Sequence, residues 1–138
     1  MTRPRPETLD WLRRLVAFDT TSRESNLPLI DAAAGFARGL GLAPRVFPAP
    51  DGRKANLCIT VPDAGGGVRG GVLLSGHSDC VPVDGQAWAS DPFAVVERDG
   101  RLYGRGTADM KGFIACCLAA LPTMLAAPLS EPIHVALS

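Results

Sequence analysis

The sequence predicts an α/β fold with a mixed, mostly parallel central sheet and helices on both faces, because helical and strand patterns alternate along one chain. Helical spacing occurs at residues 7–18 and 27–40, and a largely apolar helical segment follows at 109–126. Strand patterns occur at 55–61 and 133–137. With 138 residues, 46% hydrophobic and 20% charged, the chain is long enough for one compact domain and too apolar for a disordered class.

The first two helices are predicted from apolar spacing and from their end signals. Leucines recur at helical spacing from Leu9 to Leu15, after Pro6, a residue that is tolerated in the first turn of a helix. The alanine-rich segment 27–40 stops before Gly41, which suits the left-handed conformation that often ends a helix.

The strands are predicted from alternation and from turn residues. Residues 55–61 alternate, and the apolar run Val72–Leu74 follows a glycine-rich turn cluster, so we expect a hairpin or neighbouring strands, the second of them buried. The dipeptide Asp99–Gly100 lies between two short strand patterns and favours a type I′ hairpin, because both central residues of that turn need positive φ. A last strand is expected at 133–137.

The segment from Asp109 to Ala126 predicts a buried helix that is kinked or interrupted near Pro122, because the proline ring removes one backbone hydrogen bond.

The cysteines form no C-x-x-C pair, and we expect all of them to be reduced, buried, small hydrophobic residues. They are Cys58, Cys80, Cys116 and Cys117.

Charge and hydropathy restrict the partners. The chain has 14 Lys plus Arg and 14 Asp plus Glu, so no global field attracts nucleic acid or an anionic membrane, and a small-molecule partner is favoured. No stretch approaches the roughly 18 apolar residues of a spanning helix, and the first residues lack the apolar core of a signal peptide. These features predict a cytoplasmic location.

One of the two histidines follows the Val72–Leu74 run in "SGHSDCVPVDG". Side chains two apart in an extended strand project to the same side, so His77 and Asp79 are expected to lie together. A carboxylate beside an imidazole fixes the tautomer and leaves the other ring nitrogen free to bind a metal ion. The alternative is a solvated polar loop in which the two residues coincide by chance.

A second polar segment is "GRGTADMKG", residues 104–112, where two glycines allow a tight strand-to-helix turn. Asp109 stands at the predicted helix start, where the positive helix end stabilises a carboxylate. It is either a functional carboxylate or simply a helix N-cap. A phosphate-binding G-x-G-x-x-G loop is disfavoured, because Asp109 replaces the third glycine and would repel phosphate.

The remaining polar candidates are expected to be structural or solvated. Cys80 should be buried and point away from His77 and Asp79, because neighbouring strand residues alternate. His134 lies in the last predicted strand, where a histidine is usually structural. Trp88 is expected to pack the loop beside the site, and Arg105 and Lys111 are expected to face solvent. The stretch Thr20–Arg23 is expected to be a loop that ends a helix, without a catalytic role.

Together, "SGHSDCVPVDGQAWASDPF" and "RLYGRGTADMKGF" resemble the acetylornithine deacetylase and succinyl-diaminopimelate desuccinylase family of dinuclear zinc amidohydrolases, over residues 9–138. The resemblance implies a zinc exopeptidase-like fold and a site with two zinc ions, or cobalt in their place. It implies that His77 is a metal ligand, that Asp79 is the catalytic residue that orients it, and that Asp109 bridges both metals. It also implies a cis peptide bond between Asp109 and Met110.

Within that family the segments resemble the acetylornithine deacetylase branch. The implied reaction is hydrolysis of N2-acetyl-L-ornithine to L-ornithine and acetate in arginine biosynthesis, by metal-activated water and a glutamate base. One alternative is a desuccinylase or another acyl-amino-acid amidohydrolase. The alternative of another class is a non-catalytic fragment that serves as a folding or interaction module.

The ligand inventory is short, because a dinuclear zinc site needs about six protein contacts and the chain offers one histidine and two aspartates. We therefore expect residues 1–138 to be the N-terminal part of a metal-binding catalytic domain, inactive alone. The resemblance implies that the general base, the other ligands and the dimerisation (lid) domain of a homodimeric parent lie beyond Ser138. The strand at 133–137 would then be left partly uncovered.

Overall fold

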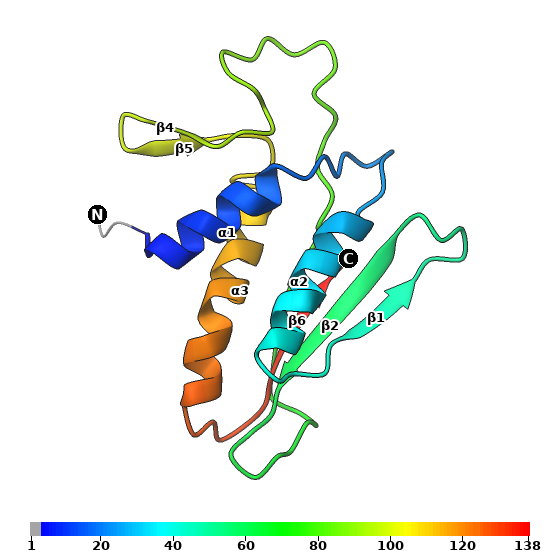
Figure 1. Cartoon of the computed structure of the whole chain (residues 1–138), viewed down its shortest axis with the longest axis vertical. Coiled ribbons are helices and arrows are strands. Elements are labelled where there is room, and N and C mark those ends of the chain that lie inside the picture. Colours follow the sequence, from blue (N-terminus) through cyan, green and yellow to red (C-terminus); the bar gives the residue numbers. More distant parts are fainter. Residues whose placement is uncertain (1–3) are drawn as a thin grey trace.

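The computed structural model describes residues 4–138, which form three helices, a four-stranded sheet and a separate two-stranded hairpin (Figure 1). The helices are α1 (Pro6–Val16), α2 (Leu27–Gly39) and α3 (Lys111–Ala126). The strands of the sheet are β1 (Arg45–Pro48), β2 (Ala55–Val61), β3 (Val72–Gly76) and β6 (Ile133–Leu137), and those of the hairpin are β4 (Val96–Arg98) and β5 (Arg101–Tyr103).

The sheet has the strand order β1-β2-β6-β3 and is mixed. Strand β6 pairs antiparallel with β2 and parallel with β3, and α3 provides the crossover that a parallel pair requires. The predicted α/β class and mixed sheet are confirmed. The expected predominance of parallel pairs does not hold within residues 4–138, because β2 runs antiparallel to both of its neighbours.

Strands β2 and β3 form neither a hairpin nor a neighbouring pair, since β6 lies between them. Strand β3 is an edge strand in the described chain, with Val72 54% and Leu73 61% exposed, so its predicted burial was wrong. The strand expected to be uncovered, β6, is instead paired on both sides. An apolar run specifies a strand, but its burial depends on partners that are distant in sequence.

All three helices lie on one side of the sheet, where α2 and α3 pack against strands and α1 packs against α3. Alternate residues of β2 are buried, and Leu57 and Ile59 pair with Leu137 and Val135 of β6, so their side chains share that face. The buried residues of α1, α2 and α3 join the same core cluster. Residues on the opposite face, such as His134, are only half-buried. The expectation of helices on both faces is therefore wrong for the described residues.

Two predicted backbone features are confirmed, and of the kink or interruption expected near Pro122 the structure excludes the interruption. Asp99 and Gly100 have φ values of 53° and 70°, as a type I′ turn requires, and Gly41 has φ 81° after α2. Helix α3 continues through Pro122 without interruption. No helix among residues 4–138 is long and apolar enough to cross a membrane.

The four cysteines are all free, as predicted, but they differ in burial. Cys80 and Cys117 are buried, and burial raises the pKa of the Cys117 thiol to about 11, which makes it unreactive at neutral pH. Cys58 is half-buried and Cys116 is exposed, so the expectation that all four are buried is wrong for these two.

Candidate metal site

His77 lies where the edge strand β3 meets the start of α3. It follows Gly76 directly, and a Cβ atom at Gly76 would lie 3.0 Å from the Phe113 ring of α3, so glycine permits this close approach. The backbone N–H of His77 donates to the Met110 sulfur at 3.4 Å. The histidine is thus held against the segment that contains Asp109.

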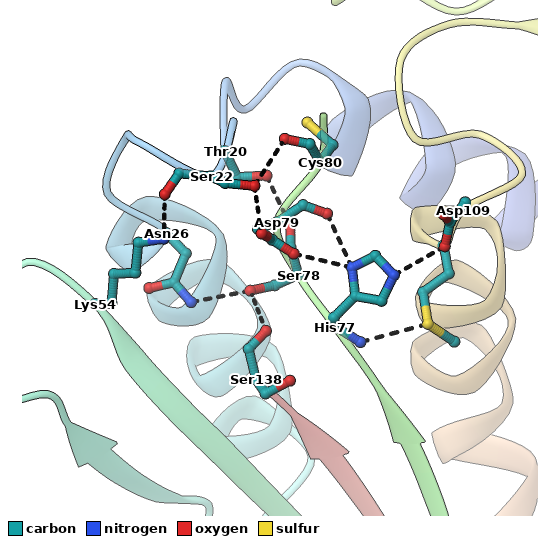
Figure 2. A network of polar contacts seen from close by, with 11 residues as sticks. Thr20, Ser22, Asn26, Lys54, His77, Ser78, Asp79, Cys80, Asp109 and Ser138 are labelled. Atoms are coloured by element: carbon teal, nitrogen blue, oxygen red, sulfur yellow. Dashed lines mark hydrogen bonds and ion pairs between the residues drawn. The ribbon is translucent and has the colours of Figure 1, made fainter. Parts of the chain in front are cut away.

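The three predicted site residues meet through the imidazole ring. His77 Nδ1 is 3.0 Å from Asp79 Oδ1, and His77 Nε2 is 2.8 Å from Asp109 Oδ1 (Figure 2). Asp79 lies on the continuation of β3, whereas Asp109 precedes α3 and comes from the other side of the ring. The structure therefore brings together a histidine and two carboxylates that the sequence separates by up to 32 residues.

Asp109 is not a helix N-cap. Helix α3 begins at Lys111, its N-cap residue is Met110, and no side chain caps it. The Asp109 side chain is 81% exposed and its carboxylate is directed at His77. The peptide bond between Asp109 and Met110 is cis, as the resemblance implied.

Lys111 anchors the turn that carries Asp109. It is fully buried, its ammonium donates to the Phe18 carbonyl at 2.7 Å at the end of α1, and its backbone N–H donates to Gly106 O at 2.8 Å. Burial lowers the pKa of Lys111. The expectation that Lys111 is solvated was wrong. The acceptor of its hydrogen bond, the Phe18 carbonyl, is distant in sequence, so the residues next to Lys111 gave no sign of it.

Replacement of Gly112 by alanine is expected to disturb this turn. A Cβ atom at Gly112 would lie 2.4 Å from the Thr107 carbonyl oxygen, so the Thr107–Asp109 backbone must move, at a cost of about 1–3 kcal/mol. Gly35→Ala in α2 is the matched control, because no atom lies within 4 Å of its Cβ position. That change is expected to raise the free energy of unfolding by about 0.5–1 kcal/mol. Urea denaturation measures the change in the free energy of unfolding for both variants. A change of the same sign in Gly112→Ala and Gly35→Ala would contradict the expectation.

The second oxygen of Asp79 binds a loop to which the sequence assigned no catalytic role. Asp79 Oδ2 accepts a hydrogen bond from Ser22 Oγ at 2.7 Å. Residues Thr20–Ser22 run beside Ser78–Cys80, since Cys80 N donates to Thr20 O and Ser22 N donates to Cys80 O, each at 3.0 Å. The contact joins residues 57 positions apart, so no local spacing indicated it.

The side chains of the other polar candidates lie outside this contact network. Cys80 is 3% exposed, as expected, and His134 is held by Thr60 Oγ1 at 2.9 Å and by Gly70 O at 3.0 Å, which is a structural role. Arg105 is packed rather than solvated, because its guanidinium lies 5.1 Å from the Trp88 ring. Trp88 Nε1 and Arg105 Nη2 both donate to Gln86 Oε1.

The contacts shift two pKa values in opposite directions. The hydrogen bond that Asp109 accepts from His77 is the largest of the effects that raise the pKa of His77 above 6.5, and burial opposes it. The Ser22 hydroxyl is the main cause that lowers the pKa of Asp79 below 3.8. Asp79 is therefore ionised at neutral pH, and the contacts of His77 favour its protonated form in the metal-free chain.

Metal-free stability is expected to depend on pH through His77. Its raised pKa stabilises the folded state fully below 6.5, and the contribution is lost as pH rises through the folded-state pKa. The side chains of His77 and Asp109 are 40% and 81% exposed, so solvent screening limits the effect to less than about 1 kcal/mol. The stability difference between the parent and His77→Gln should therefore shrink as the pH rises above 6.5 and through the raised pKa of His77. Asp79 stays ionised throughout, and a difference that grows with pH would contradict this assignment.

Comparisons with known proteins show what this chain is similar to. The description "Peptidase family M20/M25/M40" matches residues 73–138, which include all three site residues. The acetylornithine deacetylase of Yersinia pseudotuberculosis is 42% identical over 121 residues, 86% of this chain and 31% of that protein. The acetylornithine deacetylase of Klebsiella pneumoniae (strain 342) is 42% identical over 137 residues, 94% of this chain and 35% of that protein.

The resemblance seen in the sequence is thereby confirmed, and the chain spans about a third of the length of the curated M20 relatives it matches. Solved structures share the fold. Human carnosine dipeptidase 1 superposes with a TM-score of 0.78 at 24% identity over 96% of this chain and 31% of its own. The M20 family metallo-carboxypeptidase Sso-CP2 of Sulfolobus solfataricus superposes with a TM-score of 0.73 at 20% identity, over 97% of this chain and 31% of its own.

The side chains of His77, Asp79 and Asp109 have the donor set of part of a metal site. An imidazole nitrogen and a carboxylate oxygen converge, and the other ring nitrogen contacts a second carboxylate, as is usual behind a histidine ligand. Two ligands of one tetrahedral zinc ion lie about 3.4 Å apart, so the 2.8 Å contact between Nε2 and Asp109 Oδ1 needs to open by only about 0.6 Å. No group of three or more His, Cys, Asp or Glu side chains among residues 4–138 could hold a metal ion.

Proposed function

We propose that this chain contributes to a metal-dependent amidohydrolase that hydrolyses N2-acetyl-L-ornithine to L-ornithine and acetate. The observation that carries the proposal is the imidazole of His77 held between the carboxylates of Asp79 and Asp109. The substrate is proposed from the two relatives that are named acetylornithine deacetylase and are 42% identical to this chain.

In this proposal His77 Nε2 and the Asp109 carboxylate are metal ligands. Asp109 suits a bridge between two zinc ions, because its exposed carboxylate offers negative charge to both. A bound zinc ion polarises the scissile carbonyl and lowers the pKa of bound water. Two zinc ions per site, with cobalt as a substitute, belong to the proposal.

Asp79 is proposed to orient His77 rather than to act as the general base. Its Oδ1 contacts His77 Nδ1 and its Oδ2 accepts the Ser22 hydroxyl, so both carboxylate oxygens are engaged. A general base needs an oxygen within hydrogen-bond reach of the attacking water. The proposed activity therefore requires a base and further metal ligands from outside residues 4–138.

We also propose the setting that this activity implies. The partner is a small acyl-amino acid, not a nucleic acid or a membrane, and the reaction belongs to arginine biosynthesis in the cytoplasm. The described residues are part of a metal-binding catalytic domain, in a protein that is a homodimer. A succinyl-diaminopimelate desuccinylase or another acyl-amino-acid amidohydrolase would use the same three side chains, so the substrate is decided by assay.

The test is a chimera in which this chain replaces the matched segment of the Klebsiella pneumoniae acetylornithine deacetylase, to which it is 42% identical. With added zinc or cobalt, the chimera is expected to hydrolyse N2-acetyl-L-ornithine faster than N-succinyl-diaminopimelate. Asp109→Asn should abolish that turnover, whereas Asp10→Asn, a change at an aspartate that is 76% exposed on α1, should not.

Three outcomes would count against the proposal. Equal turnover of the Asp109→Asn and Asp10→Asn chimeras would remove Asp109 from the metal site. Faster hydrolysis of N-succinyl-diaminopimelate would reject N2-acetyl-L-ornithine as the preferred substrate and would leave the proposed amidohydrolase activity in place. An inactive chimera that nevertheless folds and binds zinc as tightly as the native enzyme would favour a non-catalytic role for this segment.

A further inference from the structure

The Asp79 carboxylate links the His77 ring to a loop from the other end of the chain. Its Oδ1 atom lies 3.0 Å from His77 Nδ1, and its Oδ2 atom accepts the Ser22 hydroxyl at 2.7 Å. Figure 2 shows the two partners on opposite sides of the carboxylate. Since the Asp79 side chain is 40% exposed, packing alone does not fix its rotation, and the two hydrogen bonds do.

Ser22 is itself held in place through its backbone. Its N–H donates to Cys80 O at 3.0 Å, and its carbonyl accepts the Lys54 ammonium at 2.6 Å (Figure 2). Neither contact uses the Ser22 hydroxyl. The hydroxyl is therefore presented to Asp79 from a fixed backbone position, and its removal should leave that backbone where it is.

The loop around Ser22 is clamped at both ends by buried side chains. Thr20 Oγ1 donates to Ser78 O at 2.7 Å, and both residues are at most 1% exposed. The Asn26 amide donates to Ser78 Oγ and to Ala55 O, each at 2.9 Å, and accepts the Ala55 N–H at 2.9 Å. These contacts fix the loop against both β2 and the segment that carries Asp79.

We propose that Ser22 is a positioning residue of the metal site, whose hydroxyl locks Asp79 so that His77 carries its proton on Nδ1 and presents Nε2 to a metal ion. A neutral imidazole has one N–H, and only the nitrogen without hydrogen can bind a metal. Without Ser22, the Asp79 carboxylate can rotate, so that only the Asp79 backbone carbonyl, 3.1 Å from Nδ1, still favours the Nδ1–H tautomer, and the Nε2–H tautomer bonded to Asp109 gains population. The biological role rests on the proposed function, whereas the tautomer can be measured in the metal-free chain.

The test is nitrogen-15 NMR of histidine-labelled chain at alkaline pH, where His77 is neutral and the shifts of Nδ1 and Nε2 report which nitrogen is protonated. Loss of the group that hydrogen-bonds a histidine ligand typically lowers metal affinity about 10–100-fold. Ser22 is one contact further from the ring than Asp79, so a smaller effect is expected. Ser22→Ala should therefore lower the ratio of Nδ1–H to Nε2–H by about three- to tenfold. Ser22→Thr, which keeps a hydroxyl, should keep the ratio of Nδ1–H to Nε2–H. Ser22→Val, in which valine has the shape of threonine without the hydroxyl, should lower the ratio as Ser22→Ala does.

Two internal controls separate this effect from misfolding. His134 is bonded to Thr60 and Gly70 in the sheet, so its signals should not move in any variant. Ser25→Ala removes a neighbouring loop hydroxyl that bonds Leu27 N–H and not Asp79, and should leave His77 unchanged. Equal ratios for Ser22→Thr and Ser22→Val, or an unchanged ratio in Ser22→Ala, would overturn the role of Ser22. A changed ratio with an inactive chimera would instead reject the proposed function alone.

Discussion

The 138-residue chain by itself is expected to show no measurable hydrolysis of N2-acetyl-L-ornithine and to bind zinc weakly. Only His77 Nε2 and the Asp109 carboxylate converge as ligands, and no third His, Cys, Asp or Glu joins them among residues 4–138. Affinity should therefore fall well short of the about 10–16 kcal/mol that four-ligand zinc-finger sites release. The missing general base should cost a further factor of about 10²–10⁴ in rate.

The measurement compares this chain with the Klebsiella chimera under the same zinc or cobalt concentrations, by acetate release and by calorimetric titration. The chimera supplies additional ligands, so its zinc affinity should be far higher. If the chain alone turned over substrate at a rate comparable to the chimera, the base would have to lie within residues 4–138. Asp79 would then be reconsidered as that base, despite its two engaged oxygens.

Leu118→Ala is expected to cause a large loss of stability. Leu118 is fully buried in the core cluster, on the helix that packs between α1 and the sheet. Truncation of a leucine in such a core costs about 2–5 kcal/mol, because a cavity remains after the lost transfer energy. In Leu125→Ala, where the leucine is 36% exposed, the loss should be below about 1 kcal/mol.

Urea denaturation followed by circular dichroism measures both variants. Equal losses in the two would show that α3 is not fixed in the orientation described. Because α3 begins two residues after Asp109, a weakened helix should also loosen the contact between His77 and Asp109. The His77 imidazole shifts report this contact independently of stability.

The local parts of the site could be predicted from the sequence. His77 and Asp79 are two apart on an extended segment, so the backbone period alone directs both side chains to one side. The hairpin at Asp99–Gly100 likewise depends on the φ preferences of adjacent residues. The family resemblance then added Asp109, whose contact with His77 the structure shows. Its metal role and the catalytic role of Asp79 remain predictions.

Other features were decided by the tertiary structure alone. Patterns of polarity specify strands and helices, but the insertion of β6 between β2 and β3 and the packing of all helices on one face depend on which elements pair. Lys111 is buried because the end of α1 supplies the Phe18 carbonyl, 93 residues away. Ser22 reaches Asp79 because Asn26 and Thr20 fix its loop to Ser78. Such hydrogen bonds form between groups that only the folded chain brings together, so no local period encodes them.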